Sequence, residues 1–218
     1  LRTNSRINDN VMESVMGMLG EGVAENELAA QVNRLFLQNG ADCEGTQLVC
    51  FGANGSDPHH SPDSTLLKPG DSVTIDIFTP IGRYWCDMTR TVFFRTVSER
   101  QRQVYELVRR ANEAAIAKIQ PGVLLSDLDK AARDVIAQGG YGPYFTHRLG
   151  HGIGLDCHEP PDVSGSSHTP VEAGMVFSVE PGIYLPGEFG VRIEDLVLVT
   201  QDGCEVLNAY PKELQVID

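Results

Sequence analysis

Residues 71–94 read DSVTIDIFTPIGRYWCDMTRTVFF, and this stretch decides the expected fold. Apolar and polar side chains alternate along residues 71–78 and again along residues 84–94, with the period of two that β-strands show. One polar position in each predicted strand is a carboxylate, Asp76 in the first and Asp87 in the second. If both faces of these strands are covered, each acid is buried and needs a partner.

Two more acids, Glu180 and Glu194, lie in apolar stretches that are also predicted to be strands. For any one of the four acids alone, a salt bridge or a solvated strand face is as good an explanation as a functional site. An uncompensated buried carboxylate, however, takes up a proton instead of staying charged. The strands offer only Arg90 and Arg192 as positive partners, which neutralise two acids at most. We therefore expect bound cations, which indicates a metal-dependent enzyme.

His151 adds an imidazole to these four carboxylates. Oxygen ligands with one imidazole suit Mn²⁺, Co²⁺ or Fe²⁺, and Zn²⁺ is compatible as well. Five such ligands are too many for one open site and suit two metal ions about 3.5–4 Å apart. The sequence thus predicts a centre that holds two divalent cations.

The segment 146–160, THRLGHGIGLDCHEP, is rich in histidine and glycine. His147 and His151 are four residues apart, as in a zinc-protease helix, but no Glu follows the first His and the glycines oppose a helix. A phosphate-binding loop is disfavoured too, because no strand–glycine–helix context and no Lys accompany the glycines. Three histidines within twelve residues are rarely core packing. We expect one metal ligand and two active-site donors, the third histidine being His158.

Two adjacent histidines, His59 and His60, follow Asp57 and Pro58 in a predicted loop. A lone loop histidine is usually only solvated. Two adjacent histidines in a chain with a candidate metal site favour a functional role, and His59 is included in the candidate site.

The formal net charge of the 218 residues is −13, which argues against binding to nucleic acid or to anionic membranes. No apolar run reaches the roughly 18 residues that span a bilayer. The five cysteines are irregularly spaced and contain no CxxC motif, so we expect reduced thiols in a cytoplasmic protein. The chain lacks an initiator Met, and residues 1–4 are typical of the start of an excised fragment, so we expect an N-terminal domain outside it.

Helical spacing of apolar residues predicts helices over residues 8–20 and 25–38. A capping box of Ser98 and Gln101 opens a long third helix, and Ser126 is predicted to cap the fourth. Strands are then expected near residues 174–184, 189–200 and 204–209. Helices and strands are segregated rather than strictly alternating, which favours an α+β fold over a doubly wound parallel sheet.

Five segments match a known family in the right order: VTIDIF (73–78), CDMTRT (86–91), HRLGHGIGLDCHEPP (147–161), VEPGIYLPG (179–187) and GVRIED (190–195). The chain resembles the catalytic domain of the pita-bread metallopeptidases, the creatinase/aminopeptidase superfamily, from about residue 8 to its end. Within it the chain looks most like the Xaa-Pro peptidases, prolidase and aminopeptidase P. The resemblance implies two pseudo-symmetric halves with a curved, mostly antiparallel sheet covered by helices.

The resemblance also implies roles for individual residues. The ligands of two divalent cations, expected to be Mn²⁺, would be Asp76, Asp87, His151, Glu180 and Glu194. Glu180 would also carry the proton, and His59 would lie near the scissile amide. His158 would stabilise the tetrahedral intermediate, and His147 would help to seat the substrate. Arg192 would orient a ligand acid or the carboxyl end of the substrate.

Two positions depart from the family pattern. Phe78 stands where the family usually has Gly, two residues after the first acid, and its ring is expected either to narrow the pocket or to shift the strand. Leu196 stands where an acid or polar residue is frequent. Neither change removes a ligand.

The expected function is hydrolysis of the peptide bond that precedes proline in short peptides, by a single catalytic domain spanning residues 1–218. Dipeptidase and aminopeptidase action both stay open, as does the oligomeric state, with a homodimer as one option. The alternatives are a methionine aminopeptidase and a non-catalytic peptide-binding protein on the same fold. Creatinase-type hydrolysis needs no metal, and the retained acids argue against it.

Overall fold

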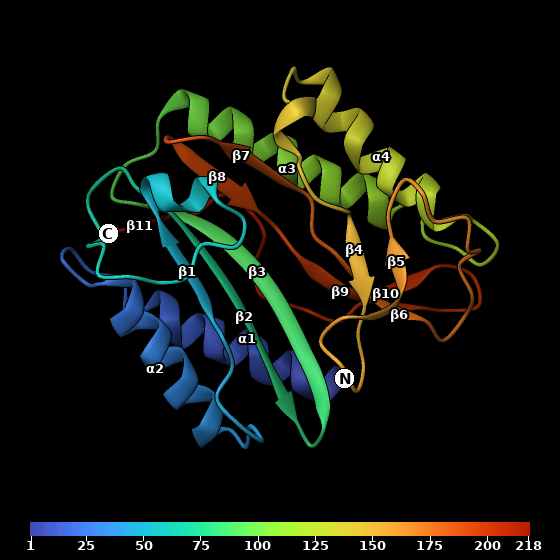
Figure 1. The fold of residues 1–218 in the computed structure, drawn as a ribbon, viewed down its shortest axis with the longest axis horizontal. Helices are drawn as coiled ribbons and strands as arrows, with labels where there is room; N and C mark the ends of the chain where they lie inside the picture. Colours follow the sequence, from blue (N-terminus) through green and yellow to red (C-terminus); the bar gives the residue numbers. More distant parts are fainter.

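The computed structural model describes residues 1–218 as strands enclosed by two helix pairs (Figure 1). The first half of the chain contains α1 (Arg2–Met16), α2 (Glu25–Gln38), β1 (Leu48–Phe51), the 3₁₀ helix η1 (Gly52–Ser56), β2 (Ser72–Ile81) and β3 (Tyr84–Phe94). The second half contains α3 (Glu99–Ile116), α4 (Leu125–Gln138), η2 (Gly142–Tyr144), β4 (Gly150–Gly152), β5 (Glu159–Val163), β6 (Val176–Val179), β7 (Gly182–Leu185), β8 (Phe189–Arg192), β9 (Asp195–Val199), β10 (Cys204–Val206) and β11 (Val216–Ile217). In Figure 1, α1 and α2 lie on one side of the strands and α3 and α4 on the other.

The strands form three sheets, with the orders β1-β2-β3-β11, β10-β9-β6-β4-β5 and β7-β8. All neighbouring strands are antiparallel except β11, which pairs parallel to β3. The expected α+β class with mostly antiparallel strands is therefore confirmed. None of the helices has the length and apolar character that crossing a membrane would require.

The β2–β3 hairpin is the longest pairing and carries the first two candidate acids. Its register sets Asp76 opposite Thr89 and Phe78 opposite Asp87. The connecting residues Gly82 and Arg83 both have positive φ, at 57° and 72°, as the tight turns that match the twist of a hairpin require. The predicted bounds of the second strand, 84–94, are confirmed.

Each half has its own apolar core beneath a helix pair. In the first, Phe36 of α2 packs with Ile75 and Ile77 of β2, all fully buried. In the second, side chains of α3 and α4 pack with Phe177 and Val197 of the five-stranded sheet. Burial of these alternating apolar positions holds the opposite face of β2, with Asp76, toward the centre of the molecule.

The capping box of Ser98 and Gln101 is confirmed, with both reciprocal hydrogen bonds present. The cap predicted at Ser126 is wrong, because α4 begins at Leu125 and its N-cap is Leu124, two residues before Ser126. The backbone N–H of Leu125 donates to the carbonyl of Thr169, and that of Ser126 to the carbonyl of Ser167, both at 3.0 Å. The neighbouring loop satisfies these donors, so no capping side chain is needed.

The first helix begins at Arg2, six residues before the predicted start at residue 8. Its first two turns bury amides in place of apolar groups. Asn4 Nδ2 donates to the carbonyls of Ile81 and Tyr84 at 2.9 and 2.8 Å, and Asn8 Nδ2 to that of Ile77 at 3.2 Å. These buried polar positions conceal the helical period, which is read from apolar residues.

Candidate active site

A cavity of about 580 Å³ is walled by residues from both halves of the chain. It brings together all nine candidate residues of the sequence analysis: His59, Asp76, Asp87, His147, His151, His158, Glu180, Arg192 and Glu194. The remaining lining residues are Leu48, Pro58, Phe78, Arg148 and Cys157. Most of the residues that line this cavity are therefore polar or charged.

The four acids enter the cavity from four places in the fold. Asp76 and Asp87 lie on β2 and β3, as predicted. Glu180 and Glu194 were predicted within strands, but Glu180 directly follows β6 and Glu194 lies in the break between β8 and β9. Pro181 cannot donate to a ladder after Glu180. The carbonyl of Glu194 accepts a hydrogen bond from Arg90 Nη1 instead of from a backbone N–H of a neighbouring strand.

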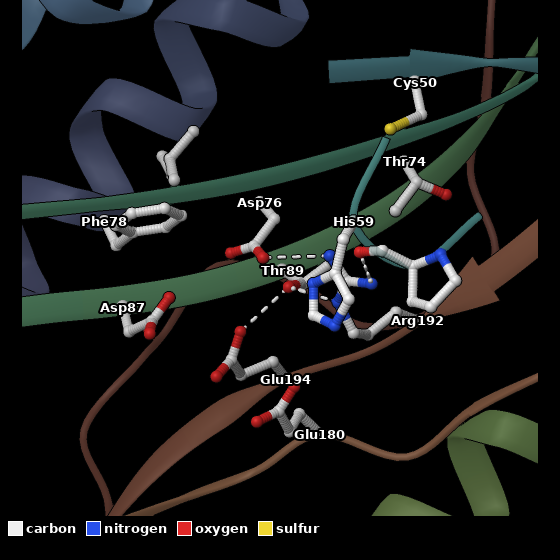
Figure 2. Close-up of polar contacts among 12 residues, drawn as sticks. Cys50, His59, Thr74, Asp76, Phe78, Asp87, Thr89, Glu180, Arg192 and Glu194 are labelled. Atoms are coloured by element: carbon white, nitrogen blue, oxygen red, sulfur yellow. Dashed lines mark hydrogen bonds and ion pairs between the residues drawn. The ribbon is translucent and has the colours of Figure 1, made fainter. Parts of the chain in front are cut away.

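Three carboxylate oxygens in the cavity are buried and have no hydrogen-bond partner. They are Asp76 Oδ1, Asp87 Oδ1 and Glu194 Oε1. The second oxygens of two of these acids are bonded, Asp76 Oδ2 to Arg192 Nη2 at 2.9 Å and Glu194 Oε2 to Thr89 Oγ1 at 2.8 Å. Figure 2 shows Asp76, Asp87 and Glu194 turned toward one space with these two contacts at its edge.

The positive side chains do not balance the acids. Arg90, expected as a possible partner, binds Asp195 Oδ1 at 2.8 Å, outside the cavity lining. Burial raises the pKa of Asp87 well above its usual value, and Glu194 and Asp76 raise it further. Burial likewise raises the pKa of Glu194 and brings that of Glu180 to about 7. The protein alone therefore lacks the positive charge that would keep these carboxylates ionised.

Asp87, His151 and Glu194 form a group whose ligand atoms all lie within 4.8 Å of one another. His151 Nδ1 lies 3.1 Å from the carbonyl of Gly152, which only accepts, so Nδ1 carries the proton. The lone pair of Nε2 then faces the acids, 3.8 Å from Asp87 Oδ2 and 3.4 Å from Glu180 Oε1. Burial lowers the pKa of His151 to about 3, which keeps the imidazole neutral. Neutral imidazole and unpartnered carboxylate oxygens are a donor set that fits divalent cations.

His147 is linked to Arg192 through a residue that the sequence analysis missed, Tyr184. The Tyr184 hydroxyl lies 2.8 Å from His147 Nε2 and accepts from Arg192 Nη1 at 2.9 Å. His147 Nδ1 donates to the carbonyl of Arg148 at 2.7 Å, so Nε2 accepts from the tyrosine. Burial lowers the pKa of His147 to about 4, so the ring is neutral. Both ring nitrogens are engaged within the protein, and the expected role in seating substrate stays a prediction.

Thr89 is the second residue that was missed. Its hydroxyl donates to Glu194 Oε2 and accepts from Arg192 Nε at 3.1 Å. Thr89 therefore links the Glu194 carboxylate to the Arg192 guanidinium. A signal for it was present, because Thr89 lies two residues after Asp87 and so shares its strand face. No such signal marks Tyr184, whose histidine partner is 37 residues away in the chain.

His59 and His158 supply polar groups at exposed positions of the cavity. The His158 ring centroid lies 4.1 Å from that of His151. Partial burial, together with Arg148, lowers the pKa of His158. Phe78 stands on the apolar part of the wall, with its ring centroid 6.3 Å from that of Trp85. The cavity thus contains a cluster of candidate metal ligands, with hydrogen-bonding histidines and an apolar wall beside it.

Residues 1–201 match the family model described as metallopeptidase family M24. An uncharacterized peptidase of Staphylococcus aureus (strain MSSA476) is 41% identical over 213 residues, which cover 97% of this chain and 61% of that protein. Among solved structures, dipeptidase PepE from Mycobacterium ulcerans is 39% identical with a TM-score of 0.97, covering 100% of this chain and 59% of that one. The Xaa-Pro dipeptidase from Bacillus anthracis is 35% identical with a TM-score of 0.97, covering 99% and 61%. The chain thus spans 60 to 61% of the length of the first curated relatives that it matches.

Proposed function

The chain belongs to metallopeptidase family M24, and from this premise we propose that it hydrolyses the peptide bond that precedes proline in short peptides. The observation that carries the proposal is the group of Asp87, His151 and Glu194 beside buried carboxylate oxygens that lack partners. The similarity to proteins described as a dipeptidase and an Xaa-Pro dipeptidase supports the substrate class.

In this proposal two divalent cations, Mn²⁺ first among Mn²⁺, Co²⁺, Fe²⁺ and Zn²⁺, are held by Asp76, Asp87, His151, Glu180 and Glu194. When bound, they supply Lewis acidity toward the scissile carbonyl and lower the pKa of a water molecule. The free oxygens of Asp76, Asp87 and Glu194 support this ligand set. The five free cysteines support a reducing compartment, so the proposed location is the cytoplasm.

The chain's own residues then position the peptide and move the proton. Glu180 is proposed to take the proton that the attacking water releases and to pass it to the leaving nitrogen, because its side chain is 16% exposed and reaches the cavity. His158 is proposed to donate to the carbonyl oxygen as charge develops there, and His59 to contact the peptide near the scissile amide. A proline nitrogen in a peptide bond carries no hydrogen, so shape must select it. The apolar wall at Phe78 offers such a surface.

The test is turnover of Ala-Pro, Ala-Pro-Ala and Met-Ala-Ser after chelation, each with Mn²⁺, Co²⁺ or Zn²⁺ added back. Cleavage of Ala-Pro alone would assign dipeptidase action, and cleavage of Ala-Pro-Ala would assign aminopeptidase action. Cleavage of Met-Ala-Ser alone would overturn the substrate class in favour of a methionine aminopeptidase. Binding of all three peptides without turnover under any metal would support a non-catalytic peptide-binding protein.

A further inference from the structure

Glu25 is a fully buried carboxylate outside the cavity lining, at the first position of α2. Its Oε1 accepts from the backbone N–H of Phe51 at 2.6 Å and from Asn54 Nδ2 at 3.0 Å. Its Oε2 lies 2.9 Å from His60 Nε2 and accepts from the backbone N–H of Asp63 at 3.2 Å. Four groups therefore converge on one carboxylate.

This cluster resembles a metal site in composition, since ligand atoms of Glu25, His60 and Asp63 lie within 4.8 Å of one another. The hydrogen bonds argue against a cation there. Two backbone N–H groups and an amide NH₂ can only donate, so both oxygens of Glu25 are already engaged. Glu25 instead accepts hydrogen bonds from several groups of a single segment of chain and so holds that segment in place.

That segment, residues 51–63, borders the cavity. The four groups that contact Glu25 come from its start, its middle and its end. Between them lies His59, which lines the cavity, whereas its neighbour His60 turns the other way, to Glu25. The carbonyl of Pro58 accepts from Arg192 Nη1 at 3.3 Å, so the same segment also touches the acidic centre. Figure 2 shows His59 facing Arg192 and the acids.

We propose that Glu25 is a positioning residue, which fixes residues 51–63 so that the His59 imidazole stands at the cavity wall. His59 is exposed and its imidazole makes no hydrogen bond of its own, so its place depends on the backbone that carries it. A shift of about 1 Å in a group that contacts the substrate can cost about a hundredfold in rate. The activity part of the inference rests on the proposed peptidase function, whereas the structural part does not.

The test is Glu25→Gln, which keeps the size of the side chain but replaces one acceptor oxygen with an NH₂ donor. We expect faster hydrogen–deuterium exchange of the backbone amides of residues 51–63. We also expect kcat/KM for Ala-Pro to fall about tenfold to a hundredfold, with bound metal per chain unchanged. The matched control is Glu27→Gln, an exposed acid in the same helical turn, which should change neither quantity.

A double-mutant cycle separates positioning from general stabilisation. If Glu25 acts through His59, adding Glu25→Gln to His59→Ala should cost less than about threefold beyond His59→Ala alone. Losses that multiply in full would overturn the inference, as would unchanged exchange over residues 51–63. If Glu25→Gln does not fold, Asn54→Ala, which removes one donor only, is held to the same two criteria. A wild-type protein that leaves both Ala-Pro and Ala-Pro-Ala intact with every added metal would refute the proposed function, and the exchange measurement would still decide the role of Glu25.

Discussion

Arg192 Nη2 and Asp76 Oδ2 lie 2.9 Å apart in a buried ion pair between residues separated by 116 positions in the chain. The pair joins β8 to β2 and neutralises one of the four acids. It leaves the second oxygen of Asp76 without a partner and buried. The guanidinium also donates to Thr89 Oγ1 and to the Tyr184 hydroxyl. The Arg192 side chain therefore holds three residues of the cavity region in place.

Replacing Arg192 with Met should therefore leave the buried Asp76 carboxylate without its positive partner. Removing one partner of a buried ion pair typically costs about 3–5 kcal/mol, and we expect a loss of that size in urea unfolding of the metal-free protein at pH 7.5. The control Arg2→Met breaks an exposed pair with Glu205 and should change stability by less than about 1 kcal/mol. Equal midpoints for the two variants would contradict the assigned role of Arg192.

Replacing Asp87 with Ala should abolish turnover and lower the bound metal per chain to near zero. Asp87 belongs to the group of three close ligand atoms, and one of its oxygens has no protein partner. Metal content after dialysis and turnover of Ala-Pro are the two measurements. Asp134→Ala, at an exposed ion pair with Lys130, is the control and should retain both. Turnover by Asp87→Ala in metal-free buffer would rule out the proposed chemistry.

The metal-free protein should lose stability as the pH rises. The pKa of Glu180 is raised from its usual 4.5 to about 7, so the folded state binds more protons than the unfolded state between these values. A group that is more protonated when folded lowers stability as the pH increases through that window. We expect thermal unfolding of the chelated protein to occur at lower temperature at pH 7.5 than at pH 5. The difference should shrink in Glu180→Gln, and an unchanged difference would assign the effect to other groups.

Phe78 should restrict the residue that precedes proline. Its ring lies on the cavity wall at a position where its strand partner is Asp87. Phe78→Ala should therefore raise kcat/KM for Leu-Pro relative to Ala-Pro, by about tenfold, as expected for a few methylene groups in an apolar pocket. Phe78→Leu should give an intermediate ratio. If both variants keep the wild-type ratio, the substrate side chain does not contact this wall.

Local patterns in the sequence predicted much of this molecule because they record interactions between near neighbours. Alternation over residues 84–94 gave the bounds of β3, and the Ser98 capping box gave the start of α3. The cap at Ser126 failed because a loop about 40 residues later satisfies the helix donors. The buried Asn4 and Asn8 concealed the start of α1 for the same reason, since their partners lie on β2 and β3.

The candidate site shows the same division. Eight of its nine residues could be named because carboxylates in apolar strands and clustered histidines are anomalies that a single chain reveals, and the role of Arg192 came from the resemblance to the family. Tyr184 and Glu25 could not be named, because each looks ordinary in sequence and gains its place from contacts across the fold. A residue that orients another is visible only when both are located in space.

The centre is built across the seam between the halves, with Asp76 and Asp87 from the first and His151, Glu180 and Glu194 from the second. Neither half alone contains enough of the proposed ligands to bind two cations. Binding of both metal ions would then depend on correct docking of the two halves, since a chain with one half undocked offers at most three of the five proposed ligands. Under the proposed function, hydrolysis would therefore require both halves to be docked.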